Sequence, residues 1–192
     1  DDSFVGSQKN LIKKTLIEQT RFGHAEFKDI GDHPLMERKE LNDIKFIRSL
    51  KDKFYNQLGT SGHGNHFVDA GYIEILSEQN KMGMAPGRYF AVLSHSGSRN
   101  FGAEVARHYT RIAKSKLNLS GEAANLAWLD LDSEEGQEYW LAMNLAGDYS
   151  AANHHIIHQK ISKAIGEKPV KMIENHHNFA WKEKISETES II

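Results

Sequence analysis

Cysteine is absent from the 192 residues of this chain, which excludes a disulfide framework and thiolate chemistry. Neither a signal-peptide pattern nor an apolar run long enough to cross a bilayer occurs, so we expect a cytoplasmic protein without a membrane partner. The net charge of −2 excludes a generally basic nucleic-acid binder and confines any nucleic-acid contact to a local patch. Proline is scarce, with three residues, whereas histidine is abundant, with eleven.

Helix and strand patterns interleave along the sequence and predict one mixed α+β domain over residues 1–192. We expect helices over 7–19, with Ser7 as the N-cap, over 37–58, with Gly59 as the C-terminal cap, over 101–117 and over 133–165. Strands are expected over 67–76, over 170–174 and over 88–94, the last buried on both faces because its run is continuously apolar. The chain begins with Asp1 and ends without a cap or turn signal, so we expect a central fragment truncated at both ends.

One glycine-rich stretch organises the rest, and it reads Gln57-Leu-Gly-Thr-Ser-Gly-His-Gly-Asn-His-Phe67. Its three glycines favour a tight turn, because glycine destabilises the interior of a helix or strand. The turn delivers Asn65 and His66 into the strand that follows. Similar polar segments occur at His95-Ser-Gly-Ser-Arg99 and at His176-His-Asn178. Each places a histidine beside an amide, hydroxyl or guanidinium, so we expect the three segments to form one site.

The histidines of these segments stand at the ends of strand-like runs, which suggests a metal site because neutral imidazole is a common transition-metal ligand. They have no local ligand spacing, and satisfied structural histidines are the alternative. Asn65 and Asn178 either support the ligands and bind phosphate or simply form turns. On the last long helix, His154 and His158 are four residues apart and able to share a metal, but no third ligand is indicated nearby.

Charged residues near the turns allow two interpretations each. Arg99 precedes an expected helix N-terminus, and its guanidinium is suited either to a phosphate or to a surface carboxylate. Asp69 either contacts a base or sugar or faces solvent. One face of the following helix carries a basic stripe, which suits an RNA backbone or is an ordinary solvated face: Arg107, Arg111 and Lys114.

The three polar segments resemble, in order, signature motifs of the RtcB family of RNA ligases. A fourth segment, Tyr149-Ser-Ala-Ala-Asn153, resembles the family's helix segment that ends in Ala-Asn-Arg, although His154 stands here in place of the arginine. The resemblance covers most of the chain.

The resemblance implies a manganese- and GTP-dependent ligase with an RtcB-like fold, in which an activating partner protein is possible. Such a ligase joins RNA ends that carry a 3′-phosphate or 2′,3′-cyclic phosphate to 5′-hydroxyl ends, in tRNA splicing or RNA repair. By motif position, the metal ligands would be His66, His95 and His177, and Arg99 would contact RNA or phosphate. The groups lining GTP and its phosphates would be Asn65, His66, Phe67, Val68, Asp69, His177 and Asn178.

Two departures from the family pattern bear on activity. The family has a cysteine metal ligand in an upstream motif, and this chain has no cysteine. The family's GMP-accepting histidine lies downstream of the third segment, and nothing after Asn178 matches it. We therefore expect no catalytic residue within this chain and no complete nucleotidyl transfer by the chain alone. The alternatives are a divergent module that binds metal and phosphate without ligating RNA, and a metal-dependent phosphoesterase.

Overall fold

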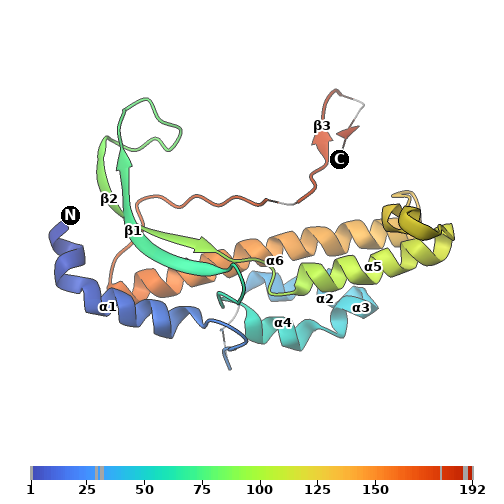
Figure 1. The fold of residues 1–192 in the computed structure, drawn as a ribbon, viewed down its shortest axis with the longest axis horizontal. Coiled ribbons are helices and arrows are strands. Elements are labelled where there is room, and N and C mark those ends of the chain that lie inside the picture. The colour runs from blue at the N-terminus through green and yellow to red at the C-terminus, as the bar shows by residue number, and fades with distance from the viewer. Residues whose placement is uncertain (1, 29, 31–32, 178, 188–189, 192) are drawn as a thin grey trace.

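The longest helix of the computed structural model, α6 (Glu134–Ile165), forms the scaffold of an elongated molecule (Figure 1). The structure describes residues 2–28, 30, 33–177, 179–187 and 190–191. The side chain of Ser133 accepts a hydrogen bond from the Gly136 amide and caps the start of α6, and Gly166 ends it with a φ of +76°. The helix predicted over 133–165 is therefore confirmed.

Shorter helices pack along α6 and bury a core rich in aromatic side chains. They are α1 (Asp2–Thr20), α2 (Glu40–Asp43), α3 (Lys45–Arg48), α4 (Lys51–Gln57), α5 (Phe101–Leu117) and the 3-10 helix η1 (Pro34–Glu37). A second 3-10 helix, η2 (Gly121–Leu126), has no buried residue. Phe54 of α4 stacks on Phe101 of α5, with ring centroids 4.4 Å apart, and both rings meet Tyr149 of α6 edge-on. This cluster fixes α4 and α5 on one face of α6, and with them the turns that precede and follow the hairpin.

A two-stranded antiparallel hairpin completes the mixed α+β fold and lies across α1 and α6 (Figure 1). Strand β1 (Phe67–Ile75) pairs with β2 (Gly87–His95), and the register places Phe67 opposite His95. The hairpin is anchored by Val68, which packs against Ile157 and Ile161 of α6. This register brings the end of the glycine-rich turn next to the end of β2.

Four predicted features of secondary structure are wrong. Helix α1 extends back to Asp2, so Ser7 is not its N-cap. The helix expected over 37–58 is broken, because Ile44 adopts an extended conformation (φ −79°, ψ 107°) between α2 and α3. Strand β2 has no fully buried residue, because the two-stranded sheet packs against helices on only one of its faces.

The fourth wrong feature is the strand expected over 170–174, which is irregular in the structure. This part of the chain continues above α6 (Figure 1), and among the described residues no backbone–backbone hydrogen bond pairs it with a strand. The structure instead pairs two short strands that were not predicted, β3 (Glu183–Lys184) and β4 (Ser190–Ile191). Among the described helices, none is long and apolar enough to span a membrane.

Candidate active site: a histidine-lined cleft

The glycine-rich turn has the conformation that its glycines predict. Gly59, Gly62 and Gly64 have φ values of +79°, +108° and +75°, in the left-handed region that disfavours other residues. Gly59 directly follows the C-cap of α4, as expected. A Cβ on Gly62 would overlap the Arg99 guanidinium and lie 2.6 Å from His66 Nδ1. The turn therefore needs glycine at this position to let the two side chains approach its backbone.

Arg99 is buried and stabilises the glycine-rich turn through hydrogen bonds. Its Nε donates to Thr60 Oγ1 at 2.7 Å, and its Nη2 donates to the Gly23 carbonyl at 3.0 Å. Burial lowers the pKa of Arg99 from its usual value, but a guanidinium stays charged at neutral pH. Among the described residues, no surface carboxylate, which was one alternative for this side chain, pairs with Arg99. Its contact with RNA or phosphate stays a prediction.

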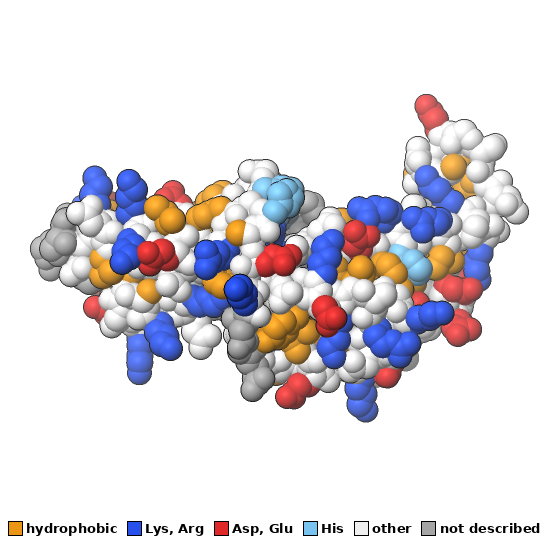
Figure 2. Space-filling model, turned by 90° about the horizontal axis from the view of Figure 1, so that it is seen from below, with side chains coloured by type: hydrophobic (Ala, Val, Ile, Leu, Met, Phe, Trp, Pro, Cys, Tyr) orange, Lys and Arg blue, Asp and Glu red, His pale blue; other side chains and the backbone are white. Residues whose placement is uncertain are grey.

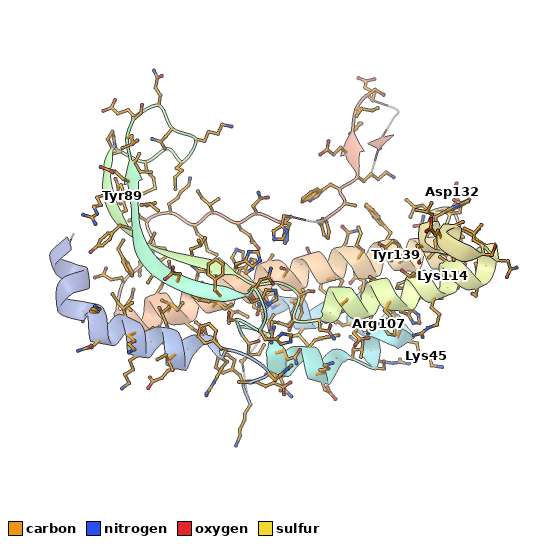
Figure 3. The ribbon with its side chains drawn as sticks, viewed as in Figure 1. Lys45, Tyr89, Arg107, Lys114, Asp132 and Tyr139 are labelled. Atoms are coloured by element: carbon orange, nitrogen blue, oxygen red, sulfur yellow. The ribbon has the colours of Figure 1, made fainter. Side chains whose placement is uncertain are left out.

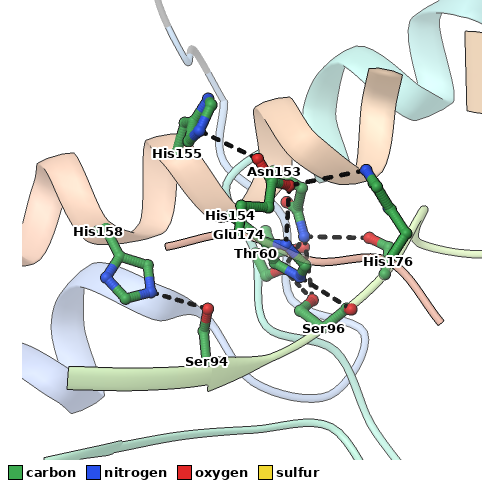
Figure 4. A network of polar contacts seen from close by, with 10 residues as sticks. Thr60, Ser94, Ser96, Asn153, His154, His155, His158, Glu174 and His176 are labelled. Carbon is green, nitrogen blue, oxygen red and sulfur yellow. Dashed lines mark hydrogen bonds and ion pairs between the residues drawn. The ribbon is translucent and has the colours of Figure 1, made fainter. Parts of the chain in front are cut away.

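Asn153 of α6 joins the glycine-rich turn to the turn after β2 (Figure 4). The Gly59 amide donates to Asn153 Oδ1 at 2.7 Å, and Asn153 Nδ2 lies 3.1 Å from the Thr60 carbonyl. The same Nδ2 lies 3.0 Å from Ser96 Oγ and 3.2 Å from the Gly97 carbonyl. Asn153 is fully buried, so this amide fixes two segments that are far apart in the sequence.

The three histidines of the sequence motifs come together in the structure. The ring centroid of His95 lies 5.9 Å from that of His66 and 5.3 Å from that of His177. All three line a cleft of about 720 Å³, together with Asn65. They come from the glycine-rich turn, from the end of β2 and from the segment after α6. The structure thus places the three segments at one cleft, and their shared function stays a prediction.

The histidines fit a metal ion in chemistry and approximate spacing. His66 Nδ1 is buried without a hydrogen-bond partner, and burial, with the nearby charge of Arg99, lowers the pKa of His66. The ring therefore stays neutral and offers a lone pair at neutral pH. Two imidazoles that share one metal have ring centroids about 5 Å apart, given a metal–nitrogen bond of about 2.1 Å. Among the described residues, no three His, Asp or Glu side chains are already arranged around one position, so metal binding requires the rings to move.

Only some of the residues expected to line GTP lie at the cleft. Asn65, His66 and His177 line the cleft, whereas Phe67, which is partly exposed, stacks on His95 with ring centroids 5.6 Å apart. Two others point elsewhere: Val68 packs in the core, and exposed Asp69 accepts a hydrogen bond from the Ala70 amide. Asn178 lies outside the described residues. The nucleotide contacts of this whole set stay predictions.

Sequence reasoning missed a carboxylate beside the cleft. Glu174 lies on the segment after α6, with Oε1 3.3 Å from His154 Nδ1 and Oε2 3.1 Å from His155 Nε2. On its other side, His154 Nε2 lies 2.9 Å from the Ser96 carbonyl. The spacing of histidines on α6 was the available signal, but it suggested a different pairing.

His154 and His158 do not face a common metal position. His158 Nε2 lies 2.9 Å from Ser94 Oγ on β2, whereas His154 contacts Ser96 and Glu174. Burial lowers the pKa of His158, which favours its neutral form. The two rings therefore hold different parts of the chain against α6.

The basic stripe on α5 has mostly local partners. Arg107 pairs with Glu104, and Lys114 Nζ lies 3.1 Å from Asn125 Oδ1 (Figure 3). On the face seen in Figure 2, Lys and Arg side chains are interspersed with Asp and Glu. These contacts favour the interpretation of the stripe as an ordinary solvated face.

Comparisons with known proteins agree with the motifs. A family model described as tRNA-splicing ligase RtcB matches residues 7–192. A protein of Methanococcus maripaludis named tRNA-splicing ligase RtcB is 31% identical over 147 residues, which cover 73% of this chain and 30% of that protein. One of Thermococcus kodakarensis with the same name is 33% identical over 126 residues, which cover 62% of this chain and 26% of the relative.

An RNA-splicing ligase RtcB homolog 1 of Entamoeba histolytica is 28% identical over 140 residues, which cover 67% of this chain and 27% of that protein. The chain thus spans less than a third of the length of these relatives. The family model, however, matches almost the whole sequence, including all three histidine segments. On this match, the chain belongs to the RtcB family.

Proposed function

We propose that this chain supplies part of the active centre of an RNA ligase. The whole protein would join RNA ends that carry a 3′-phosphate or 2′,3′-cyclic phosphate to 5′-hydroxyl ends, with Mn²⁺ and GTP as cofactors, in tRNA splicing or RNA repair. The names of the curated relatives, which are tRNA- or RNA-splicing ligases, support the reaction class. A cytoplasmic location, the RNA substrate and an activating partner protein belong to the same proposal.

The observation that carries the proposal is the convergence of His66, His95 and His177 in one cleft. These residues are separated by up to 111 positions in the sequence, and a purely structural role would not require their rings to line a common cavity. Neutral imidazoles that face a cavity are suited to hold a divalent cation.

Each group has a role that follows from its chemistry. His66, His95 and His177 would hold Mn²⁺, which when bound neutralises charge on phosphoryl oxygens. The exposed amide of Asn65 at the cleft would donate hydrogen bonds to phosphate oxygens. Arg99 would act on the site mainly through the turn that it stabilises, because its Nε is bonded to Thr60 of the turn and its Nη2 to Gly23 beside it.

Removal of the central imidazole tests the metal site directly. We expect the chain to bind Mn²⁺ stoichiometrically and the His95→Ala variant to bind it at least 100-fold more weakly, because His95 lies between the other two rings. Electron paramagnetic resonance of free and bound Mn²⁺ during a titration measures this. His108→Ala is the matched control, since His108 stacks on Phe46 of the core, with ring centroids 3.9 Å apart, and does not line the cleft. Absent binding, or equal binding by His95→Ala, would contradict the metal site.

RNA assays on the whole protein separate the three functions. End joining of 3′-phosphate and 5′-hydroxyl RNAs that depends on GTP and His95 supports the ligase. Release of inorganic phosphate without joining would instead show a phosphoesterase, in which a metal-bound hydroxide needs no covalent histidine. Metal and RNA binding without either product would show a binding module.

A further inference from the structure

His154 connects the two sides of the histidine-lined cleft. One contact is with the Ser96 carbonyl, at 2.9 Å from Nε2, and Ser96 directly follows His95. The other is with the Glu174 carboxylate, at 3.3 Å from Nδ1, and Glu174 precedes His177 by three residues. One imidazole on helix α6 thus contacts two of the three segments that carry predicted metal ligands, those of His95 and His177 (Figure 4).

The segment that carries His177 has few other attachments. Among the described residues, no backbone–backbone hydrogen bond joins residues 168–182 to another part of the chain. Its position depends on side chains, chiefly on Glu174 at α6 and on the ring of Phe179, which packs where a Cβ on Gly147 would lie. The position of His177 relative to His95 therefore depends on a small number of contacts.

We propose that His154 is a positioning residue that sets the separation between His95 and His177 through its bonds to Ser96 and Glu174. The link to metal binding rests on the proposed function, whereas the link to the position of the His177 segment does not. His155 also contacts Glu174, at 3.1 Å, but within the described part of the chain no contact joins its ring to the Ser96 side of the cleft. Only His154 spans both sides among these neighbouring rings.

The chemistry of the partners indicates which substitutions preserve the connection. A carbonyl and a carboxylate both accept hydrogen bonds, so the connection is best made by a side chain with a donor toward each of them. His154 and Glu174 have side chains only 13% and 20% exposed, so water competes little for the contact between them. Arginine carries several N–H donors and is always charged, and it would satisfy both acceptors, whereas alanine would satisfy neither.

Spin labels test the positioning without any metal. Because the chain has no cysteine, the substitutions Arg111→Cys on α5 and Lys171→Cys on the His177 segment allow specific labelling at two exposed positions. Pulsed dipolar spectroscopy of this doubly labelled protein is expected to give a narrow distance distribution. His154→Ala should at least double its width, and His155→Ala should leave it nearly unchanged. Equal widths in the parent and His154→Ala would overturn the proposal.

Mn²⁺ titration of the unlabelled variants tests the consequence for the cleft. We expect His154→Ala to weaken Mn²⁺ binding about 10- to 100-fold, as loss of groups that orient ligands does in known metal sites. His155→Ala should remain within about threefold of the parent, and His154→Arg should restore most of the affinity lost in His154→Ala. Circular dichroism confirms that each variant is folded.

The two experiments separate the proposals. Failure of the parent chain to bind Mn²⁺, with the distance distribution still broadened by His154→Ala, would overturn the metal site and leave the positioning role standing. Normal Mn²⁺ binding by His154→Ala would overturn its role at the metal. A loss in His154→Ala that His154→Arg does not recover would show that the histidine is needed for something other than joining the two sides.

Discussion

Asn153→Ala is expected to lower the free energy of unfolding by about 3–5 kcal/mol. The substitution removes one amide that bonds Gly59, Thr60, Ser96 and Gly97. Each buried donor or acceptor left without a partner costs about 1–3 kcal/mol. Local rearrangement recovers only part of this loss. Thr60 and Ser96 are held in place by their other contacts and are not free to turn toward new partners.

Chemical denaturation, followed by circular dichroism, measures this effect. Asn144→Ala is the matched control on the same helix, because the Asn144 amide makes one bond among the described residues, a local one to the Trp140 carbonyl at 2.7 Å. We expect the control to lose less than about 1 kcal/mol. Similar losses in the two variants would show that Asn153 does not join the turns with the strength that its contacts imply.

Gly62→Ala is expected to damage both the fold and the metal site. The added Cβ would overlap the Arg99 guanidinium, lie 2.6 Å from His66 Nδ1 and be strained by a φ of +108°. Displacement of a buried guanidinium breaks its bonds to Thr60 and Gly23. We expect a loss of about 2–4 kcal/mol in unfolding free energy and at least tenfold weaker Mn²⁺ binding.

Gly64→Ala separates the steric effect from backbone strain. Gly64 has a similar left-handed conformation, with a φ of +75°, but nothing lies within 4 Å of an added Cβ. We expect it to cost about 1 kcal/mol, from strain alone, and to leave Mn²⁺ binding within about twofold. Thermal unfolding and Mn²⁺ titration of both variants give the comparison. An equal loss of metal affinity in Gly64→Ala would contradict the role assigned to the space at Gly62.

The sequence predicted the turns well because their residues have strong local preferences. Glycines in the 57–67 stretch and Gly166 after α6 adopt the left-handed conformations for which glycine is suited. The two strand runs were predicted because each is short and bounded by such turns, whereas their antiparallel pairing and register come from the structure alone. The break at Ile44 was not predictable, because an extended residue within an apolar helical pattern leaves that pattern unchanged.

Contacts across the cleft were harder to predict than the segments that form it. The burial of Arg99 depends on Gly23, which is 76 residues away in the sequence. The pairing of Glu174 with His154 and His155 has no spacing signal, because the histidines lie on α6 and Glu174 lies on the irregular segment that follows it. The motifs identified which segments carry the candidate ligands, but only the fold shows which residues hold those segments in place.

The long sequence separations around Asn153 also bear on the order in which the protein folds. Its bonds join residues 94, 93, 57 and 56 positions apart, whereas the bonds within α5 and α6 are local. Contacts between distant residues require large loops to close, and loop closure lowers chain entropy before the contact is made. The helices therefore begin to form from contacts between nearby residues, whereas the cleft forms only after distant segments of the chain have come together. Assembly of the cleft is thus coupled to the completion of folding rather than to helix formation.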